Sequence, residues 1–299
     1  MLTQPHLLTG DEFTAEELTQ LLTLANQLKN DHTLHRHTLT GRHVALAFDK
    51  PSLRTRFSFT VAVQQLGGSV VESVGDSRKN EAPKDFIRVL QGYCDALMIR
   101  TFNDDFLQLM QPFAPIPIIN GLTDKYHPCQ TLADLLTLQQ KFDNPLSDLT
   151  LCYVGDGNNV LHSLLLMAPK LGIRIHYCCP DEHEPDPSVL AQVSKHQLDH
   201  LVQAYSQPEQ AVANAHAVYT DVWTSMGFSE KDPTLFAGYQ VNEQLMQLAT
   251  PEAIFMHCMP MNRGEEVSET LPDQPNSAVF QQSENRLHVQ KAILIQLLT

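Results

Sequence analysis

The chain has 299 residues, with 20 lysines and arginines against 34 aspartates and glutamates, so its net charge is −14. This length suggests two domains. An acidic chain binds nucleic acid and anionic membranes poorly, which argues against both as partners and means that an anionic substrate would need a local cluster of positive charge.

The start of the chain lacks the basic and apolar segments of a signal peptide. No apolar run of about 18 residues, the length that spans a membrane as a helix, occurs in the sequence. The six cysteines follow no disulfide framework, and most lie in apolar stretches, as buried reduced thiols do. These features predict a cytoplasmic protein with no membrane-spanning segment.

The first predicted helix follows Thr14. Thr14 and Glu17 have the spacing of a capping box, and leucines at helical spacing come after them. The polar linker beyond this helix carries His32, His35 and His37. These histidines could bind a metal ion, but a solvated loop is the favoured interpretation.

The stretch from residue 43 to residue 67 contains a strand, a polar turn and a helix. An apolar run at 43–48 predicts a buried parallel strand. The helical pattern at 57–66 ends at Gly67, a residue type that commonly closes helices. Such a unit directs free backbone N–H groups and the positive end of the helix dipole at one point.

The same turn carries the hydroxyl groups of Ser52 and Thr55 and the guanidinium groups of Arg54 and Arg56. Arginine binds phosphate oxygens in pairs, and cations at a helix start are unfavourable unless something negative offsets them. These features predict an anion site whose favoured ligand is phosphate. The alternative is that the arginines are solvated or pair with surface carboxylates.

Two more predicted strands of the first half lead into polar residues. The strand at 96–99 ends at Arg100, and the strand at 117–120 is followed by His127 and Gln130. Open α/β sheets bind ligands at the carboxyl ends of their strands. The other elements predicted here are a strand at 70–74 and helices at 85–93 and 131–142.

The second half repeats the alternation of strands and helices. Polar motifs again follow the strands. The predicted fold class is therefore α/β, with two domains that each have a central parallel sheet flanked by helices. The predicted strands lie at 149–154, 174–179, 217–220 and 253–256, and the predicted helices at 160–171 and 283–298.

Cofactor sites are weakly suggested in this half. Gly155 and Gly157 could begin a dinucleotide fingerprint, but Val160 stands at the third glycine position. Cys178 and Cys179, with histidines nearby, could suggest zinc, but their side chains face opposite sides of one strand and no second ligand pair is near. We predict no nucleotide cofactor and no metal.

Four motifs stand in order along the chain, and each is weak alone. Together they resemble the aspartate/ornithine carbamoyltransferase family, in particular its ornithine-using members, from the first helix to the last. Aspartate-using members lack the Ser-Met-Gly sequence and the cysteine found here at position 258. The motifs are Ser52-x-Arg-Thr-Arg56, His127-Pro-x-Gln130, Asp221-x-x-x-Ser-Met-Gly227 and His257-Cys-x-Pro260.

The resemblance implies transfer of the carbamoyl group from carbamoyl phosphate to the side-chain amine of L-ornithine, giving L-citrulline and phosphate in arginine metabolism, with no cofactor. It implies a carbamoyl phosphate-binding domain at 1–135 and an ornithine-binding domain at 136–283. The C-terminal helix, 284–299, is expected to pack back on the first domain. Members of the family are homotrimers or assemblies of trimers.

The resemblance also assigns residues to each substrate. Arg100, His127 and Cys258 are the catalytic residues that it implies, with Thr55, Arg100 and His127 forming an oxyanion hole. The ornithine-binding residues are Asn159, Asp221, Ser225 and Met226. The carbamoyl phosphate-binding residues are Ser52, Leu53, Arg54, Thr55, Arg100, His127, Gln130, Cys258, Met259 and Arg286.

The sequence departs from the family pattern in two places. Leu53 stands where ornithine-using members usually have threonine, and relatives that act on N-acylated ornithine tolerate an apolar residue there. The loop at 75–83 is about two residues shorter than the corresponding loop of the family. In family members this loop reaches the neighbouring subunit's site, and Arg78 or Lys79 could take that role here. An N-acylated ornithine or a related amine is therefore an alternative acceptor, and a metabolite-binding relative without activity is a further alternative.

The chemistry constrains the surroundings of Cys258. The amine of ornithine titrates near lysine, at about 10.4, so removing its proton at pH 8 costs about 3 kcal/mol. A site that holds the neutral amine beside Cys258 and away from carboxylates would offset part of this cost. Cys258 could instead be a covalent nucleophile, but the side chain of His257 should diverge from it and no third group to orient a base is apparent.

Overall fold

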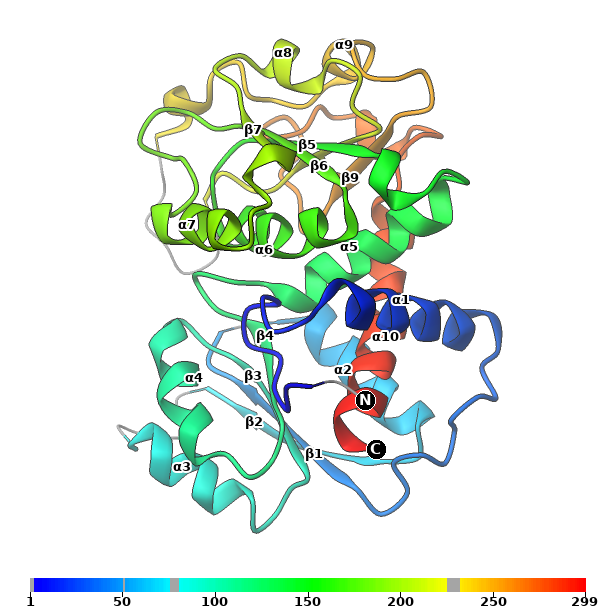
Figure 1. Ribbon diagram of the computed structural model, residues 1–299, viewed down its shortest axis with the longest axis vertical. Helices are drawn as coiled ribbons and strands as arrows, with labels where there is room; N and C mark the ends of the chain where they lie inside the picture. Colours follow the sequence, from blue (N-terminus) through cyan, green and yellow to red (C-terminus); the bar gives the residue numbers. More distant parts are fainter. Residues whose placement is uncertain (1–2, 51, 76–80, 225–231) are drawn as a thin grey trace. The chain divides into compact units, whose positions relative to one another are not determined.

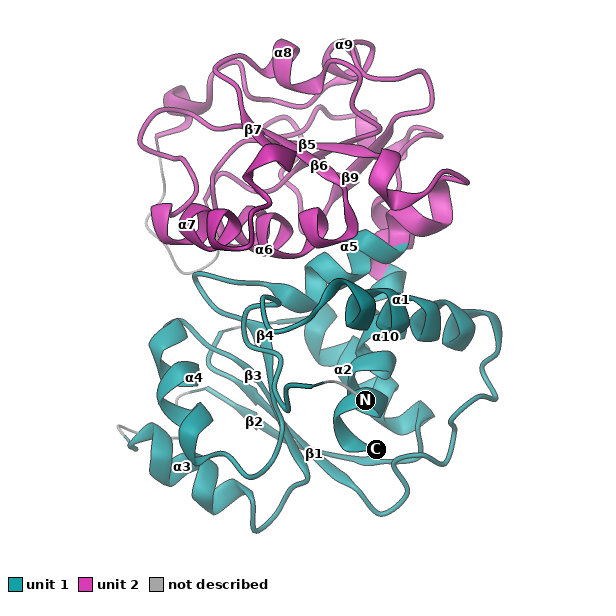
Figure 2. Cartoon of the chain, viewed as in Figure 1, with its two compact units in different colours: residues 1–136, 284–299 teal, residues 137–283 magenta. Residues whose placement is uncertain are grey.

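The computed structural model describes residues 3–50, 52–75, 81–224 and 232–299. The chain forms two compact units, residues 1–136 with 284–299 and residues 137–283 (Figure 2). Each unit has a central parallel sheet with helices packed on it (Figure 1). The predicted α/β class is therefore confirmed. The chain divides after residue 136, and the boundary that the resemblance implies is after residue 135.

The sheet of the first unit has the strand order β2-β1-β3-β4, with all pairs parallel. The connection after β2 returns to the other side of β1, so the strand order reverses between β1 and β3. In open α/β sheets this reversal opens a crevice at the carboxyl ends of the strands. The strands are β1 (His43–Phe48), β2 (Ser69–Val74), β3 (Ala96–Arg100) and β4 (Ile118–Leu122).

Helices cover both faces of this sheet (Figure 1). Alternate strand residues such as Ala45, Leu97 and Ile99 pack against Ile87 of α3 and Leu107 of α4 in one apolar cluster. Helices α1 and α2 lie on the opposite face (Figure 1). The helices are α1 (Ala15–Asn30), α2 (Arg54–Gln65), α3 (Pro83–Leu90), α4 (Asp104–Met110) and α5 (Pro128–Lys141).

The predicted elements of this unit are confirmed with shifted ends. Helix α2 begins at Arg54, three residues before the predicted start, because the polar residues that were assigned to the turn already form its first helical turn. Gly67 follows the helix with a φ of +85°, and a Cβ there would lie 2.7 Å from the carbonyl oxygen of Arg36. Glycine is therefore required at this position by both its backbone angle and its close contact.

The sheet of the second unit has the order β7-β6-β5-β8-β9, again with all pairs parallel. Its strand order reverses between β5 and β8. The sequence analysis did not identify β7, a three-residue edge strand whose side chains are largely exposed. The strands are β5 (Thr150–Val154), β6 (Arg174–Cys178), β7 (Val202–Ala204), β8 (Ala217–Thr220) and β9 (Ile254–His257).

The core of the second unit is built in the same way. Cys152, Val218 and Phe255 of the sheet pack with Val212 of α8 and Leu245 of α9. Helices α6 and α7 pack together on the other face (Figure 1). The remaining helices are α6 (Asn159–Met167), α7 (Pro187–Lys195), α8 (Pro208–Val212), α9 (Glu243–Met246) and α10 (Val279–Leu298).

Two predicted helix ends in this half are wrong. Helix α6 ends at Met167, and the predicted continuation is a 3-10 turn over Ala168–Leu171 that contains Pro169. Proline removes a backbone donor and disfavours a continued α-helix. The last helix begins at Val279 rather than near residue 284, since Val279 is buried in the core of the second unit.

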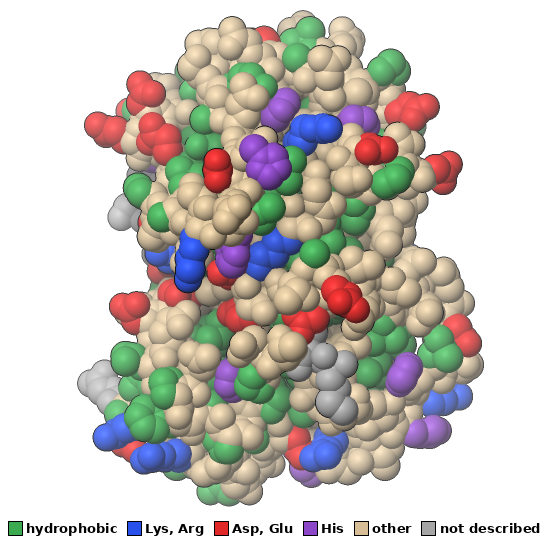
Figure 3. Space-filling view, in the orientation of Figure 1, with side chains coloured by type: hydrophobic (Ala, Val, Ile, Leu, Met, Phe, Trp, Pro, Cys, Tyr) green, Lys and Arg blue, Asp and Glu red, His purple; other side chains and the backbone are tan. Residues whose placement is uncertain are grey.

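On the face drawn in Figure 3, the coloured Lys and Arg side chains lie in small separate groups and are interspersed with acidic ones. Among the described residues, no helix combines the length and the apolar character that crossing a membrane requires. All six cysteines are free thiols, and five of them are buried.

The capping box of α1 is present, and it gives a stability prediction. The Thr14 hydroxyl accepts a hydrogen bond from the backbone N–H of Glu17 (3.2 Å), while the Glu17 carboxylate accepts one from the backbone N–H of Thr14 (2.8 Å). Thr14→Ala removes the first bond and should lower the free energy of unfolding by about 1 kcal/mol in a urea titration. Thr23→Ala, on the exposed middle of the same helix, is the control and should have no destabilising effect, since alanine is the better helix former.

Candidate functional site

The first group of site residues lies where β1 leads into α2. Ser52 is half-buried and Thr55 is fully buried at the first turn of the helix. The first N–H groups of a helix have no intrahelical acceptors, so this turn offers backbone donors and the positive dipole end next to the reversal in strand order. The geometry suits an anion such as phosphate.

A second cation reaches the same turn from the last helix. The Nη2 atom of Arg286, on α10, donates a hydrogen bond to the Thr55 hydroxyl at 2.5 Å, and both side chains are buried. The two residues are 231 positions apart in sequence, and both belong to the first unit. This contact brings together two of the residues that the resemblance assigns to carbamoyl phosphate.

The two arginines of the turn behave differently. Arg56 forms an ion pair with Glu72 at 2.5 Å, so the alternative interpretation, pairing with a surface carboxylate, is correct for Arg56. Arg54 makes no such ion pair among the residues that the structure describes, and it remains the candidate phosphate ligand. Leu53 precedes the helix without a side-chain cap and is 63% exposed.

His127 and Arg100 form the second group of this unit. Arg100 ends β3 at a shift in its register with β4, and such irregularities redirect side chains near ligand sites. His127 precedes α5 and is buried. Burial lowers the pKa of His127 well below its usual value, and the nearby charges of Arg286 and Arg100 lower it further. The imidazole is therefore neutral at physiological pH and offers one N–H donor.

Gln130 completes this group with a hydrogen-bond acceptor. Its Nε2 atom donates to the Oδ1 atom of Asp134 at 2.8 Å, and a carboxylate can only accept, so the amide orientation is fixed. The Oε1 atom is buried and has no partner among the described residues. A buried acceptor without a partner is costly, so this atom is suited to a ligand with an N–H donor.

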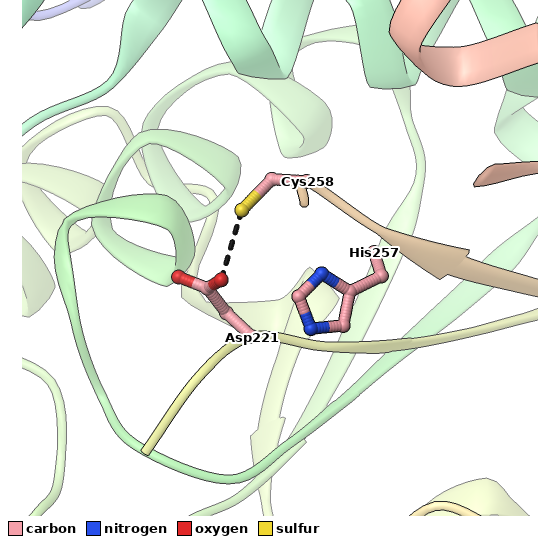
Figure 4. Close-up of side chains that lie close together, drawn as sticks. All are labelled: Asp221, His257 and Cys258. Carbon is pink, nitrogen blue, oxygen red and sulfur yellow. Dashed lines mark hydrogen bonds between the residues drawn. The ribbon is translucent and has the colours of Figure 1, made fainter. Parts of the chain in front are cut away.

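The second unit gathers its polar residues around Asp221, which follows β8. Asn158, at the start of α6, donates from Nδ2 to the Oδ2 atom of Asp221 at 2.8 Å. The Sγ atom of Cys258, just beyond β9, donates to the Oδ1 atom of Asp221 at 2.8 Å (Figure 4). Asp221 is thus a buried carboxylate held at both oxygens, at the second reversal in strand order.

These contacts correct two expectations about Cys258. It lies against a carboxylate, not away from one. The side chain of His257 does not diverge from it, since the potential ligand atoms of Asp221, His257 and Cys258 all lie within 4.8 Å of one another (Figure 4).

His257 is nevertheless unable to act as the base for Cys258. Its Nδ1 atom accepts a hydrogen bond from the backbone N–H of Met259 at 2.9 Å, so the ring proton is on Nε2, which faces Glu266 at 3.1 Å. The Cys258 thiol keeps its proton while it donates to Asp221, and the thiol form is not nucleophilic. The geometry therefore favours Cys258 as a substrate contact.

The same cluster has the ligand types of a metal site. Asp221, His257 and Cys258 supply oxygen, nitrogen and sulfur donors. Each of them already makes hydrogen bonds, to Asn158, Glu266 and one another, which a metal ion would have to replace. The arrangement as it stands is a hydrogen-bonded carboxylate–thiol pair.

The other site residues of the second half are only partly described. Asn159 is buried at the first position of α6. Met259 is half-buried, with a left-handed backbone of φ 57° in the turn after β9. Four candidate residues lie outside the described part of the chain: Ser225, Met226, Arg78 and Lys79.

The sequence reasoning missed Asn158 and Glu266. Asn158 caps α6 by accepting from the N–H of Val160 at 2.9 Å, so an asparagine directly before an apolar helix was the available signal. Nothing in the sequence pointed to Glu266, which is nine positions from His257.

The turn at Gly157 is closely packed by its own chain, because a Cβ there would lie 2.5 Å from the backbone of residues 183–185.

Comparison with known proteins agrees with this geometry. The profile described as "Aspartate/ornithine carbamoyltransferase, carbamoyl-P binding domain" matches residues 5–140. The profile described as "Aspartate/ornithine carbamoyltransferase, Asp/Orn binding domain" matches residues 147–297. The first range includes Ser52, Arg54 and Thr55 at the start of α2, and the second includes Asp221 and Cys258.

Relatives resemble the chain over nearly its whole length. It is 45% identical to a protein of Nostoc sp. named ornithine carbamoyltransferase, with 98% of this chain and 96% of the relative covered. The crystal structure of ornithine carbamoyltransferase from Thermus thermophilus matches with a TM-score of 0.90 at 39% identity, and that from Gloeobacter violaceus with 0.89 at 42%. The first match covers 99% of both chains and the second 100% of both. The chain therefore belongs to the aspartate/ornithine carbamoyltransferase family.

Proposed function

We propose that the chain transfers the carbamoyl group from carbamoyl phosphate to the side-chain amine of L-ornithine, giving L-citrulline and phosphate. The observation that carries this proposal is the buried cluster of Thr55, Arg286, Arg100 and His127 beside the start of α2. It concentrates donors and positive charge in a chain whose net charge is −14. The relatives named ornithine carbamoyltransferase support the same activity.

Carbamoyl phosphate is the substrate of residues 1–135 with the helix at 284–299. Its phosphate binds the N–H groups at the start of α2 together with Ser52, Arg54 and Thr55, with Leu53 contributing its backbone. The carbamoyl oxygen accepts from Arg100 and the neutral His127. The carbamoyl NH₂ donates to the Oε1 atom of Gln130, the acceptor that has no partner among the described residues.

These donors also promote the chemical step. When the amine attacks, negative charge develops on the carbamoyl oxygen, and Thr55, Arg100 and His127 stabilise it as an oxyanion hole. Arg286 holds the Thr55 hydroxyl in place for this purpose. The bond between the carbamoyl carbon and the phosphate oxygen then breaks, and the departing phosphate takes up the proton that the amine loses. Its negative charge lies against Arg54 and the helix N-terminus, where the dipole stabilises it.

L-Ornithine is the substrate of residues 136–283. The α-ammonium group pairs with Asp221, and the α-carboxylate is bound by Asn159 and by the segment that carries Ser225 and Met226. Cys258 and the Met259 carbonyl contact the reacting group. Asn158 holds the Asp221 carboxylate through its 2.8 Å hydrogen bond, so we assign it a positioning role.

Leu53 and Asp221 point to different acceptors. Leu53 is the residue that favours an N-acylated ornithine, and its side chain is exposed. Acylation would remove the positive charge from the α-nitrogen, however, and Asp221 would then have no ammonium group to pair with. Putrescine has no α-carboxylate for Asn159. The carboxylate at the reversal in strand order therefore favours the free amino acid.

The assembly that we propose is a homotrimer or a set of trimers, in the cytoplasm, acting in arginine biosynthesis. The edge strand β2 and the start of α2 expose apolar side chains of Phe57, Val71 and Val74. An edge strand with exposed apolar residues is prone to pair with another chain unless it is covered. A neighbouring subunit would cover this surface.

The substrate is tested by comparing three amines. The purified chain should form citrulline rapidly from carbamoyl phosphate and L-ornithine, and much more slowly carbamoylate N-acetylornithine or putrescine, because each of these lacks one group that the site binds. Product formation is measured by colorimetric detection of the ureido group and by mass spectrometry. Activity on either alternative with none on ornithine would refute the proposed acceptor.

The phosphate ligand is tested with Arg54→Ala. Charge-assisted hydrogen bonds contribute about 1.5–3 kcal/mol each. The affinity for carbamoyl phosphate, measured by calorimetry, should therefore fall by about 10- to 100-fold. The matched control is Arg56→Ala, two positions away, whose guanidinium pairs with Glu72 and should matter little. Equal effects of the two substitutions would contradict the assignment of Arg54.

The protonation of His127 is tested by NMR. Because burial and the charges of Arg286 and Arg100 lower its pKa, its ring signals should show no titration midpoint at or above pH 6.5. The unfolded chain takes up a proton there near pH 6.5 while the folded chain does not, so His127 should destabilise the fold as the pH falls below about 6.5. His127→Asn identifies the signals, and a midpoint at 6.5 or higher would be the contrary result.

A further inference from the structure

Lys50 is a buried cation that neither the mechanism above nor the four motifs use. It directly follows β1, its side chain is only 3% exposed, and its Nζ atom forms an ion pair with the Oδ1 atom of Asp124, which follows β4. The same Nζ atom lies 4.4 Å from the centre of the Phe102 ring, which follows β3. One ammonium group therefore contacts residues from the ends of two other strands.

The Lys50–Asp124 contact connects two strand ends that the sheet itself does not connect. The order is β2-β1-β3-β4, so β1 and β4 are not neighbours and share no backbone hydrogen bonds. The Lys50–Asp124 pair crosses the end of β3 and joins the loops on either side of it. In the described part of these loops, backbone hydrogen bonds connect each loop to the next one, from the Asp49 N–H to the Arg100 carbonyl and from the Asp124 N–H to the Phe102 carbonyl, both at 2.9 Å.

The joined loops carry the two halves of the carbamoyl phosphate residues. The loop that begins with Lys50 continues into Ser52, Arg54 and Thr55. The loop that contains Asp124 continues to His127, three residues later, and then to α5 with Gln130. The Lys50–Asp124 pair therefore links the segment that carries the candidate phosphate ligands to the segment that carries the candidate carbamoyl ligands.

We propose that Lys50 and Asp124 are positioning residues, whose ion pair over Phe102 fixes the spacing between the phosphate-binding turn and the His127–Gln130 segment. This inference rests on the proposed function, since it assigns both segments to one substrate. A rigid, bound acyl phosphate fits only one spacing, and a misplacement of about 1 Å in a reacting group costs on the order of 100-fold in rate. The buried ammonium keeps its place because loss of its carboxylate partner would leave it uncompensated.

The test uses Lys50→Met, Asp124→Asn and the double variant in the full-length enzyme. Each single variant should lower kcat/KM for carbamoyl phosphate by about 10- to 100-fold while the KM for ornithine stays within about twofold. Because both substitutions break the same pair, the double variant should lose no more than the worse single one. Lys50→Arg, which retains the charge and its donors, should recover most of the activity.

Matched controls are Lys195→Met and Asp199→Asn, an exposed lysine and an exposed aspartate of the second unit. They should leave both kinetic constants unchanged. Thermal melting of every variant separates misplacement from unfolding, since the proposal expects a folded enzyme with a lower kcat/KM for carbamoyl phosphate and an unchanged KM for ornithine.

Three results would overturn the proposal. If Lys50→Met is damaging and Asp124→Asn is not, Lys50 binds substrate directly. If the losses of the two single variants add in the double variant, the residues act independently. If neither variant changes the kinetics of an active parent enzyme, the pair has no positioning role; an inactive parent enzyme would instead refute the proposed function.

Discussion

The function of this chain depends on binding a doubly charged anion to a protein that is itself acidic. The net charge of −14 repels carbamoyl phosphate at long range, so binding must come from short-range contacts. The start of α2 supplies backbone donors and a dipole, and Arg286 reaches the same turn from the other end of the chain. Their benefit depends on burial, because a buried charge–anion contact is stronger than an exposed one.

Parallel sheets give this chain its two sets of polar residues. In each unit the strand order reverses once, and candidate site residues follow the strands on both sides of that reversal, β1 and β3 in the first unit and β5 and β8 in the second. Other candidates follow the adjoining strands β4 and β9, as His127 and Cys258 do. The first set is dominated by cations and donors around Thr55. The second is dominated by the carboxylate of Asp221. The same type of fold thus places donors and cations at the reversal in one unit and a carboxylate at the reversal in the other, which suits the proposed reaction of an acyl phosphate with an amino acid.

Local patterns in the sequence predicted most of the strands, the capping box and the strand–turn–helix unit of β1 and α2, because each is set by neighbouring residues. Contacts between distant segments could not be predicted in that way. The Thr55–Arg286 bond joins residues 231 positions apart, and only the family resemblance suggested it. The carboxylate beside Cys258 was not expected, since Asp221 and Cys258 are 37 positions apart and meet only because β8 pairs with β9. The start of the last helix was placed too late because it is set by a distant contact, the burial of Val279 in the core of the second unit.

The most direct test of the central claim is a crystal structure of the protein soaked with carbamoyl phosphate. The account predicts phosphate oxygens at the start of α2 within hydrogen-bond distance of Arg54 and Thr55, with the carbamoyl NH₂ directed at the Oε1 atom of Gln130. An empty turn, with the Arg54 guanidinium in bulk solvent at a saturating ligand concentration, would contradict it.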